Sequence, residues 1–563
     1  MLKSPNEETL AGLFFVAALL IFVDTAIAEN KPVTDEQLRQ GTEDTSGWYH
    51  YGGNYENWRY SPLEKINRTN VAKLAPAWIF QTGIPGQMAN SPVVADGVLY
   101  VTSAYNHLWA LDARTGDALW YYQHSLPADL RLCCGPANRG VAIHGDRVFM
   151  ATLDAHLVAI NRDSGDVEWQ IKLAAHDKGF SATGAPLIVG DLVITGVGGG
   201  EYGARGFIDA YDVATGERRW RRYVVPAKGE PGNETWAGDS WKTGGGPTWA
   251  TGSYDPEQNL LLWPTGNPSP DWDGDVRAGD NLYSNSVLAL KPETGEIVWH
   301  FQFTPHDVWD FDATNGLVVA ELALADGPKR VVLQPNRNGY VYMLDAKSGK
   351  FLRGTQYVDR LNWSKGLTAE GRPVVDEDYL PLAGGNPRYV CPGTAGGHNG
   401  SFTYAFNGRT LFVPSIESCV KPETASMPFK EGDPYWGGSP GATEGEDGSS
   451  YGIFLAIDAL TGERLWRHKD PHPFFGGALA TGGGLVFSGN QRGYALALDA
   501  ESGDVLWKFQ TGSSIRGQPV TWELDGRQYV AIGSGSGGAV PSFMGTPDVV
   551  TTGSALVIFA IPE

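Results

Sequence analysis

The most regular pattern of apolar and polar positions in this chain is an eleven-residue phrase that recurs along its length. Each copy has an apolar strand, a polar turn with glycine at a fixed place, and a second strand that opens on tryptophan. Glycine supplies the positive φ that a tight hairpin turn requires. Each phrase therefore predicts an antiparallel hairpin. The copies are ALDARTGDALW (110–120), AINRDSGDVEW (159–169), AYDVATGERRW (210–220), ALKPETGEIVW (289–299), MLDAKSGKFLR (343–353), AIDALTGERLW (456–466) and ALDAESGDVLW (497–507).

A shorter phrase, APAW at 75–78, brings the number of predicted outer strands to eight. Further β-rich runs, such as 91–103 and 482–498, lie between the phrases. Four short strands per unit, repeated eight times, predict an all-β, eight-bladed β-propeller. Each tryptophan is expected to pack flat on the neighbouring repeat, and the C-terminal run 554–561 to pair with the N-terminal segment and close the ring. The outer strands are predicted to open at Trp78, Trp120, Trp169, Trp220, Trp299, Arg353, Trp466 and Trp507.

The spacing of these phrases also predicts two long insertions. Eight units over residues 29–563 average about 67 residues, more than the ~40–50 of a plain blade. The wide intervals are Trp220 to Trp299 and Arg353 to Trp466. Loops of that length are usually functional or disordered. We expect residues 29–563 to form a single propeller domain with long inserted loops.

An apolar run from Leu10 to Val23 occupies the N-terminus and ends near Ala26-Ile27-Ala28. Its length and the small-x-small triplet are typical of a secretory signal and short for a membrane span. Lys3 is the only base before it, so an uncleaved membrane anchor is the alternative. We expect residues 1–28 to be a signal peptide and the mature chain to be periplasmic.

Composition and charge narrow the class of partner. The chain has 73 Gly, 19 Trp and a formal net charge of −21. The negative charge argues against a nucleic-acid partner and is compatible with a basic protein partner. The sequence has no Cys-x-x-Cys-His motif, so covalent c-type haem is not expected. Electrons from a redox reaction would then leave through an external acceptor.

The four cysteines are Cys133, Cys134, Cys391 and Cys419. In an exported protein an even count suggests disulfides. Cys391 and Cys419 would close one loop, which leaves Cys133 to pair with its neighbour Cys134. Such a vicinal disulfide is uncommon, and two buried free thiols are the alternative.

Three carboxylates, Asp307, Asp310 and Asp312, lie among aromatic residues in 304–315. In extended backbone Asp310 and Asp312 would point to the same face. Like charges on one face repel unless a cation or a proton lies between them. A solvated acidic loop is the plainer interpretation, but such loops seldom contain aromatic residues. Our hypothesis is that these carboxylates hold a hard cation and supply a base.

Two other motifs could complete a cation site. The run 198–203 places Glu201 on a glycine-rich backbone, and Gly266-Asn267-Pro268 offers an amide oxygen on a rigid turn. With Asp310 and Asp312 they make an all-oxygen set, which suits a hard ion. Each residue alone is more often a turn or capping residue, so the case depends on the combination.

Together these motifs resemble the pyrroloquinoline quinone (PQQ)-dependent alcohol dehydrogenases of the methanol and ethanol dehydrogenase large-subunit type. The resemblance spans nearly all of the mature chain. It implies that a small primary alcohol is oxidised to an aldehyde by hydride transfer to metal-bound PQQ, with a soluble cytochrome c as acceptor. It rests on the tryptophan repeat, Cys133-Cys134 followed by Asn138-Arg139-Gly140, Gly-Gly-Gly-Glu201, Thr-Gly-Asn267-Pro and Trp-Asp310-Phe-Asp312.

The resemblance also implies a role for individual residues. A Cys133–Cys134 disulfide would lie over one face of PQQ and Trp249 under the other. Asp310 would be both a metal ligand and the general base that takes the hydroxyl proton. The remaining metal ligands would be Glu201 and Asn267, and the cofactor would be bound by Arg139, Thr183, Gly199, Gly200, Arg337 and Asn399. A core aromatic for Trp249, a hairpin brace for Arg337 and a strand end for Thr183 are the plainer alternatives.

Asp312 bears on the choice of metal. In the calcium enzymes that the chain resembles, this position tends to be small and uncharged, whereas the lanthanide-dependent branch has Asp. A third protein carboxylate beside anionic PQQ overloads a divalent ion with negative charge, and a trivalent ion balances it better. We therefore expect a lanthanide ion, with Ca²⁺ as the alternative.

Three departures from the family pattern bear on cofactor affinity and substrate choice. They are Gln87 in place of a frequent Glu, Pro247 in place of a frequent Thr, and Phe475 in place of a Trp beside the substrate cavity. Phe474 and Phe475 suggest an apolar pocket wall and alcohols larger than methanol.

Two other functions are compatible with the chain, and so is a homodimer. One is a PQQ and calcium dehydrogenase for a sugar or polymer alcohol. The other is a non-catalytic exported propeller, which should lack the cysteine pair, Glu201 and the Asp310/Asp312 pair.

Overall fold

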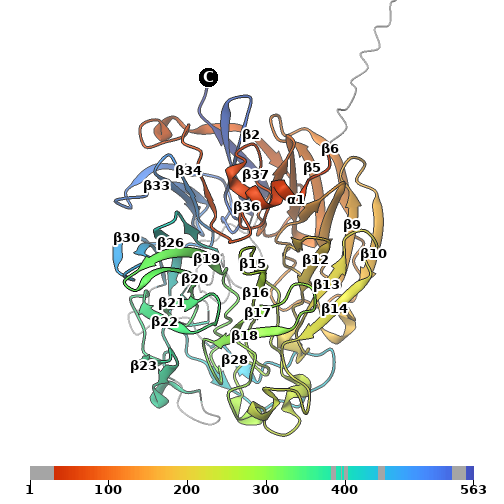
Figure 1. Ribbon diagram of the computed structural model, residues 1–563, viewed down its shortest axis with the longest axis vertical. Coiled ribbons are helices and arrows are strands. Elements are labelled where there is room, and N and C mark those ends of the chain that lie inside the picture. Colours follow the sequence, from red (N-terminus) through yellow and green to blue (C-terminus); the bar gives the residue numbers. More distant parts are fainter. Residues whose placement is uncertain (1–30, 382–387, 395, 398–402, 442–449, 536–552) are drawn as a thin grey trace, which may run out of the picture.

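The strands of the protein form a ring of eight sheets around a central axis (Figure 1). The structure is a computed structural model that describes residues 31–381, 388–394, 396–397, 403–441, 450–535 and 553–563. Each sheet has four antiparallel strands, and β1 (Tyr60–Ser61) joins one of them in parallel. The prediction of an all-β, eight-bladed propeller is confirmed. The predicted signal peptide, residues 1–28, lies outside the described residues.

The blades follow one another along the chain, and the first four precede residue 303. They are β3 (Val93–Ala95), β4 (Val98–Ser103), β5 (His107–Asp112) and β6 (Ala118–Gln123); β7 (Ala142–His144), β8 (Arg147–Ala151), β9 (His156–Asn161) and β10 (Val167–Lys172); β11 (Leu187–Val189), β12 (Leu192–Gly196), β13 (Phe207–Asp212) and β14 (Arg218–Tyr223); and β15 (Ser253–Asp255), β16 (Leu260–Pro264), β17 (Ser286–Leu290) and β18 (Ile297–Gln302).

The other four blades complete the ring. They are β19 (Val318–Leu324), β20 (Gly327–Pro335), β21 (Tyr340–Asp345) and β22 (Phe351–Gln356); β25 (Ala405–Phe406), β26 (Thr410–Glu417), β29 (Tyr451–Asp458) and β30 (Arg464–Asp470); β31 (Leu479–Thr481), β32 (Leu485–Gly489), β33 (Tyr494–Asp499) and β34 (Val505–Gln510); and β35 (Val520–Leu524), β36 (Arg527–Gly535) and β37 (Ser554–Ala560) with β2 (Ala75–Gln81).

The two ends of the domain close the ring within this eighth blade. Strand β2 pairs antiparallel with β37, with Trp78 opposite Ile558. The indole of Trp507 in the seventh blade donates a hydrogen bond of 2.9 Å to the Leu74 carbonyl, just before β2. The expected pairing of the C-terminal strand with the N-terminal segment is therefore confirmed.

The outer-strand tryptophans other than Trp507 pack on the turn glycine of the neighbouring blade, in line with the predicted packing on the next repeat. A Cβ at Gly295 would lie 2.4 Å from the ring of Trp220, and the Trp220 indole donates 2.7 Å to the Pro292 carbonyl. Where the repeat has Arg353, the guanidinium donates to the carbonyls of Ala459 and Leu460 instead. One detail of the prediction was wrong. The outer strands begin before the tryptophan, because a β-bulge precedes it, as between β17 and β18.

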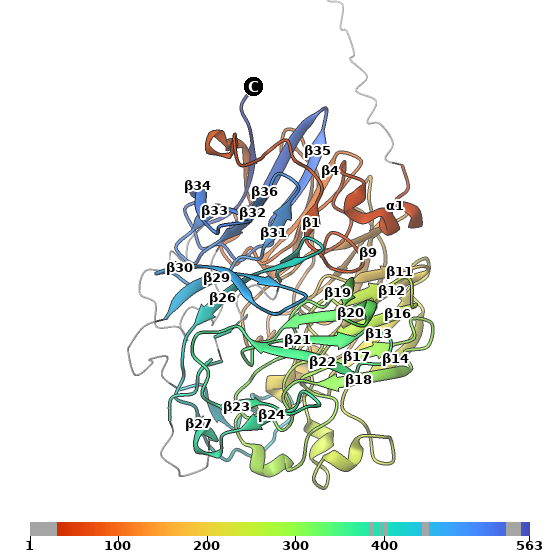
Figure 2. The same ribbon diagram turned by 60° about the vertical axis from the view of Figure 1, so that its left-hand side comes forward.

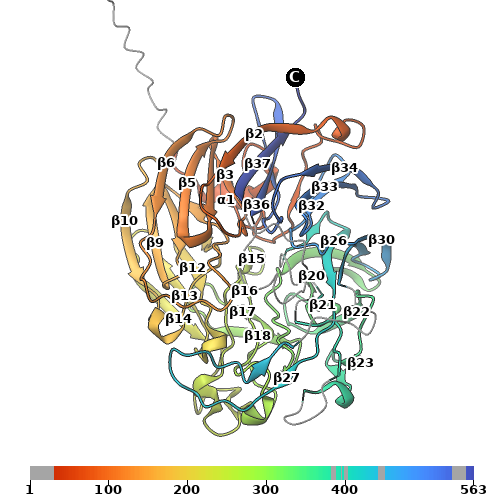
Figure 3. The ribbon, with the colours of Figure 1, turned by 180° about the vertical axis from the view of Figure 1, so that it is seen from behind.

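The inserted segments gather at one end of the molecule (Figure 2; Figure 3). The second insertion contains the hairpins β23 (Ser364–Leu367) with β24 (Pro373–Val375) and β27 (Glu423–Thr424) with β28 (Gly438–Ser439). The remaining elements are the helix α1 (Asp35–Gln40) and short 3₁₀ turns. These turns are η1 (Gly41–Glu43), η2 (Val71–Lys73), η3 (Ala104–Asn106), η4 (His176–Lys178), η5 (Gly200–Tyr202), η6 (Asn233–Thr235), η7 (Ser240–Thr243), η8 (Gly274–Arg277) and η9 (Glu377–Tyr379).

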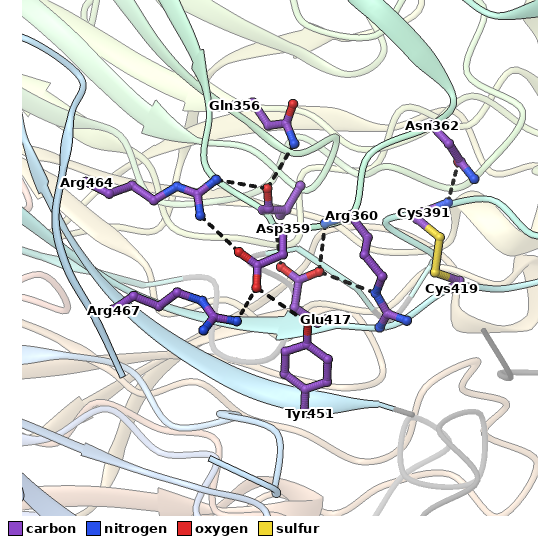
Figure 4. Close-up of polar contacts among 11 residues, drawn as sticks. Gln356, Asp359, Arg360, Asn362, Cys391, Glu417, Cys419, Tyr451, Arg464 and Arg467 are labelled. Atoms are coloured by element: carbon purple, nitrogen blue, oxygen red, sulfur yellow. Dashed lines mark hydrogen bonds and ion pairs between the residues drawn. A yellow bond between two sulfur atoms is a disulfide. The ribbon is translucent and has the colours of Figure 1, made fainter. Parts of the chain in front are cut away.

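The base of the second insertion is tied to the sixth blade by a disulfide and a buried carboxylate (Figure 4). Cys391 and Cys419 are bonded, as predicted. Glu417, at the end of β26, accepts hydrogen bonds from the backbone N–H groups of Asp359 at 2.7 Å and Arg360 at 3.2 Å. Within the described ranges, no helix is long and apolar enough to cross a membrane.

Candidate active site

A cavity of about 160 Å³ lies where loops from different blades converge. Its lining comes from the loops after β2, β6, β10, β12, β18 and β34, the β20–β21 turn and both insertions. One water needs only roughly 10–15 Å³, so the cavity has room for a larger ligand. The lining includes Gln87, Leu132, Cys133, Cys134, Arg139, Thr183, Gly199, Glu201, Trp249, Asp310, Asp312, Arg337, Thr394 and Arg516.

The loop 304–315 is folded by the carboxylate of Asp307. This buried group accepts hydrogen bonds from the backbone N–H groups of Trp309 at 2.9 Å and Phe311 at 2.8 Å. The chain therefore turns at Asp310, whose φ is +60°. The extended backbone that we expected for this run is wrong, and so is the grouping of Asp307 with the cation-holding carboxylates.

Asp310 and Asp312 nevertheless face the same guanidinium, that of Arg337. Arg337 Nη2 lies 3.7 Å from Asp310 Oδ2, and Arg337 Nη1 lies 3.1 Å from Asp312 Oδ2. The other oxygen of Asp312 accepts 2.8 Å from the backbone N–H of Asn267. The motifs at 266–268 and 310–312 are thus joined directly. Asp312 is held by Arg337, the Asn267 N–H and the side chain of Trp249, whereas Asp310 is the freer carboxylate.

A fourth carboxylate, Asp271, belongs to this group and was missed in the sequence. It is 3% exposed. Burial, and next the charges of Asp310, Glu201 and Asp312, raise the pKa of Asp271 well above its ordinary value. The available signal was the run Pro-Asp-Trp-Asp at 270–273, which mixes carboxylates with tryptophan as 304–315 does.

The pKa values of the other three carboxylates are raised as well. Burial is the largest cause for each of them. The pKa of Glu201 rises to about 7, with a further contribution from Asp312. That of Asp310 rises well above its ordinary value, and the charges of Asp312, Asp307 and Glu201 add to the effect of burial. Buried carboxylates this close together, three of which have their pKa raised by a neighbour's charge, form a site that favours a cation.

Cys133 and Cys134 are bonded to each other and form part of the cavity wall. Cys133 Sγ lies 3.2 Å from Glu201 Oε1. A disulfide sulfur does not ligate metals as a thiolate does, so the pair serves as a wall beside Glu201. Trp249 also lines the cavity, and the guanidinium of Arg139 lies 4.4 Å from its ring centroid. Arg139 Nη1 donates 2.7 Å to the Thr183 hydroxyl.

Glycines let the two ligand-bearing turns approach each other. A Cβ at Gly199 would lie 2.7 Å from the Gly179 carbonyl, and one at Gly200 would lie 3.0 Å from Pro247. The same hypothetical Cβ at Gly200 would lie 3.7 Å from Asn267 Oδ1. Pro247 accepts the backbone N–H of Gly266 at 2.7 Å. The Glu201 and Asn267 turns are therefore packed together through Pro247.

The second insertion covers the Glu201 turn. Tyr435 N–H donates 2.7 Å to the Glu201 carbonyl, and Trp272 N–H donates 3.1 Å to the Trp436 carbonyl. Arg131 forms an ion pair of 2.7 Å with Asp433 in the same segment. This cover limits the access of water to the carboxylates.

Two expectations about the pocket are not met, and one lies outside the described residues. Phe474 packs against Phe454 in the sixth-blade core, with ring centroids 5.4 Å apart, and does not wall the cavity. Phe475 lies under Arg516, whose guanidinium is 5.0 Å from the ring centroid. Arg516 itself was missed, because a single Arg in a β-rich run carries no sequence signal. Asn399 lies outside the described residues.

The arrangement fits a hard cation and an anionic aromatic ligand. Glu201, Asp271, Asp310 and Asp312 supply carboxylate oxygens, which hard cations prefer. The buried side chain of Asn267 lies beside the carboxylate of Asp271, so it belongs to the same polar cluster. Arg139, Arg337 and Arg516 face the same cavity as the Trp249 ring, which suits a flat ligand with carboxylate groups.

Comparison with known proteins agrees with this geometry. The family model for the glucose/ethanol/alcohol dehydrogenase β-propeller domain matches residues 48–358, and that for the outer membrane protein assembly factor BamB matches 452–537. The chain is 42% identical over 574 residues to the quinoprotein alcohol dehydrogenase PedH of Pseudomonas putida, covering 97% of this chain and 95% of PedH.

Two lanthanide-related proteins are also similar. The lanthanide-dependent methanol dehydrogenase of Methylacidiphilum fumariolicum is 33% identical over 613 residues, covering 100% of this chain and 99% of that protein. The solved structure of a europium-containing methanol dehydrogenase superposes with a TM-score of 0.88 at 33% identity, covering 93% of this chain and 100% of that one.

Proposed function

Because the chain belongs to the PQQ-dependent alcohol dehydrogenase family, we propose that it oxidises primary alcohols to aldehydes in the periplasm, with PQQ and a lanthanide ion as cofactors. The observation that carries the proposal is the group of carboxylates Glu201, Asp310 and Asp312 beside Arg337, in a cavity walled by the Cys133–Cys134 disulfide and Trp249. A soluble cytochrome c would receive the electrons, and residues 1–28 would direct export.

The residues divide the work of binding. Glu201, Asn267 and Asp310 would hold the metal, with Asp312 as a further ligand. Arg139, Thr183, Arg337 and Asn399 would hold the carboxylates and carbonyls of the quinone, beside the backbone of Gly199 and Gly200. When bound, the metal would supply Lewis-acid polarisation and PQQ would supply the hydride acceptor for the alcohol carbon.

Asp310 is the proposed base. It lines the cavity and stays partly exposed to it, and its contact with Arg337 is the longer of the two at 3.7 Å. It can take the hydroxyl proton only when ionised. Its pKa falls once a positive charge lies among the four carboxylates. Arg337 steadies the carboxylate, and the cover over Glu201 keeps bulk water from competing for the proton.

The number of carboxylates supports a trivalent ion. The structure adds Asp271 to the expected Glu201, Asp310 and Asp312. A larger negative charge around one ion favours a higher ionic charge. We therefore propose lanthanide in preference to calcium.

The test is purification of the full chain, followed by metal analysis, a quinone absorbance spectrum and dye-linked oxidation of a panel of primary alcohols and sugar alcohols. We expect bound PQQ, a metal, and turnover of primary alcohols. A preference for sugar alcohols with calcium would contradict the proposed substrate and metal. Protein that stays inert with PQQ and either La³⁺ or Ca²⁺ would contradict catalysis altogether.

A further inference from the structure

Two histidines and a carboxylate lie together between the first and second blades. His124 follows β6, Asp154 lies in the turn between β8 and β9, and His156 is the first residue of β9. His124 Nε2 lies 2.9 Å from Asp154 Oδ1, and His156 Nδ1 lies 3.0 Å from Asp154 Oδ2. Each residue offers one ligand atom, and these three atoms lie within 4.8 Å of one another. Two imidazoles and one carboxylate are a donor set that zinc-class ions prefer.

The spacing of these atoms fits a single small ion. An ion with bonds of about 2.0–2.1 Å to nitrogen and oxygen holds neighbouring ligand atoms roughly 2.9–3.4 Å apart, depending on its geometry. The two nitrogen–oxygen distances of 2.9 Å and 3.0 Å are at the lower edge of that range. Small rotations of the side chains are therefore enough to admit an ion among them.

The backbone on both sides of this group is fixed through Asn106, which lies in the first blade. The backbone N–H of His124 donates 3.2 Å to the Asn106 carbonyl, and the N–H of Leu153 donates 2.8 Å to Asn106 Oδ1. The Thr152 hydroxyl donates 2.6 Å to Asp154 Oδ1. Because the fold already holds these residues in place, little has to be ordered when an ion binds.

Each imidazole has a place for its proton other than the nitrogen that faces Asp154. The Tyr122 hydroxyl lies 3.2 Å from His124 Nδ1 and can accept the proton of that nitrogen, which leaves the lone pair of Nε2 for an ion. In His156, Nδ1 is buried while the side chain is 19% exposed, so solvent reaches the side chain away from Nδ1. A partner that fixes the tautomer of a ligating histidine is usual in metal sites.

The charge of the group also favours a cation. His124 and Asp154 are each 5% exposed. Burial alone would raise the pKa of Asp154, but hydrogen bonds from His124, His156 and Thr152 lower it below its ordinary value. With both imidazoles neutral, the ionised carboxylate leaves one negative charge in a buried place, which a cation balances. The plainer interpretation is a carboxylate that only accepts hydrogen bonds from two histidines, and the experiment below separates the two.

We propose that His124, Asp154 and His156 bind a zinc-class dication, such as Zn²⁺ or Cu²⁺, which joins the first and second blades. This site differs in chemistry from the carboxylates that line the cavity, whose oxygen ligands suit a hard ion. The segment that follows His124 carries Cys133 and Cys134, so the ion fixes the start of the segment that forms the cavity wall. The inference does not depend on the proposed function.

The experiment is a calorimetric titration of the full chain with Zn²⁺, after removal of bound metal by a chelator. For His156→Gln we expect the Kd for Zn²⁺ to rise by more than about 100-fold, because even an outer partner of a ligand contributes about 10- to 100-fold. Tyr122→Phe removes such an outer partner and should raise the Kd by about 10- to 100-fold. His144→Gln is the matched control and should bind as the wild type does, since His144 lies 2.9 Å from a single carboxylate, that of Asp35, in the same second blade.

The electron paramagnetic resonance spectrum of bound Cu²⁺ identifies the ligands. We expect coupling to two imidazole nitrogens in the wild type and to one in His156→Gln. A spectrum with oxygen ligands alone would overturn the proposal. So would a Kd for Zn²⁺ that is unchanged in His156→Gln and raised in Asp310→Asn, because the ion would then lie among the carboxylates of the cavity.

Thermal unfolding shows whether the ion joins the blades. Zn²⁺ should raise the unfolding temperature of the wild type and of His144→Gln but not that of His156→Gln, since an ion that binds only the folded state stabilises it. Tyr122→Phe keeps all three ligands, so a smaller increase in this variant supports the site independently of any loss of stability in His156→Gln. A wild type that neither binds Zn²⁺ nor gains stability from it would overturn the proposal and leave Asp154 as a hydrogen-bond acceptor for two histidines.

Discussion

The three carboxylates of the loop 304–315, Asp307, Asp310 and Asp312, have different roles although they lie within six positions of one another. Asp307 accepts the backbone N–H groups of Trp309 and Phe311 and shapes the loop. Asp310 faces the cavity, and Asp312 is held by Arg337 and the Asn267 backbone. The sequence pattern predicted that carboxylates placed among aromatic residues have a function. It could not assign the roles, because these depend on which carboxylate meets the loop's own N–H groups.

Asn substitutions at Asp310 and Asp307 should therefore differ in kind. Asp310→Asn removes the proposed base, and we expect kcat to fall about 10²- to 10⁴-fold with little change in unfolding temperature. Asp307→Asn replaces one of two acceptor oxygens with an NH₂ group that cannot accept a hydrogen bond, which costs about 1–3 kcal/mol of stability. Steady-state kinetics and thermal unfolding of both variants check this. A wild-type kcat in Asp310→Asn would exclude it as the base.

Asp312→Ala tests the choice of metal. The substitution removes one negative charge and the partner of Arg337 Nη1. We expect activity with La³⁺ to be lost by more than activity with Ca²⁺, because the trivalent ion depends more on the extra carboxylate. The measurement is dye-linked alcohol oxidation after reconstitution with each metal. Equal activity of the wild type with both ions, or no loss in Asp312→Ala with La³⁺, would rule out lanthanide preference.

At the scale of the element, most contacts between neighbouring blades consist of a tryptophan ring packed on a turn glycine. A Cβ would lie within 3.0 Å of the preceding tryptophan ring at Gly116, Gly165, Gly216, Gly295, Gly349 and Gly503. These contacts could be predicted, because glycine and tryptophan keep a fixed spacing in every copy except 343–353, where Arg353 replaces the tryptophan. The bulge before each tryptophan could not, because it follows from pairing with the neighbouring strand.

Gly295→Ala should destabilise the protein more than Gly190→Ala. Both glycines have positive φ, +66° and +56°, so alanine costs about 1–2 kcal/mol of backbone strain at either site. Only the Gly295 substitution also meets the Trp220 ring, which adds about 1–3 kcal/mol of overpacking. Denaturant midpoints of the two variants measure the difference. Equal losses of stability in the two variants would mean that the Trp220 ring moves aside at no cost in free energy.

The base of the second insertion should make stability depend on pH through Glu417. Burial raises the pKa of Glu417 from 4.5 to about 7. The folded state then holds a proton that the unfolded state releases above about pH 4.5, so stability is lost as the pH rises toward 7. The contribution is on the order of 3 kcal/mol.

Glu417→Gln should remove this dependence. We expect the variant to gain stability relative to the wild type between pH 5 and pH 8, measured as the difference in unfolding temperature of the cofactor-loaded proteins. Glu370→Gln, on the exposed turn between β23 and β24, is the control and should follow the wild type. A parallel pH profile for Glu417→Gln and the wild type would contradict the inferred protonation.

At the scale of the whole molecule, the negative charge should govern encounter with the proposed electron acceptor. A net charge of −21 attracts a basic protein over a distance that shrinks from about 30 Å to about 10 Å between 0.01 M and 0.1 M salt. We expect the rate with a basic cytochrome c to fall on the order of tenfold over that range. The rate of reduction of a small neutral dye should not change with the salt concentration. A salt-independent rate with the cytochrome would argue against a charge-steered partner.

The ring of blades could be predicted best from the sequence, and the lining of the cavity could be predicted least well. Seven copies of one phrase, with the shorter APAW at 75–78, fix the number of blades, and the C-terminal strand without a phrase of its own indicates how the ring closes. Asp271 and Arg516 were missed because they come from an insertion and from the loop between β34 and β35, where no repeat sets the register. Packing between distant parts of the chain brings these two residues to the cavity, and their spacing along the sequence does not reveal that packing.

Closure within the eighth blade has a consequence for biosynthesis. Strand β2 is made early and finds its partner β37 only when the end of the chain is available. Gln87 and Arg516 stand on the two loops that flank this blade. A chain that stops before residue 554 leaves β2 without its partner and both loops without support. Because domains fold as units, a chain truncated before residue 554 should fail to hold the proposed cofactor.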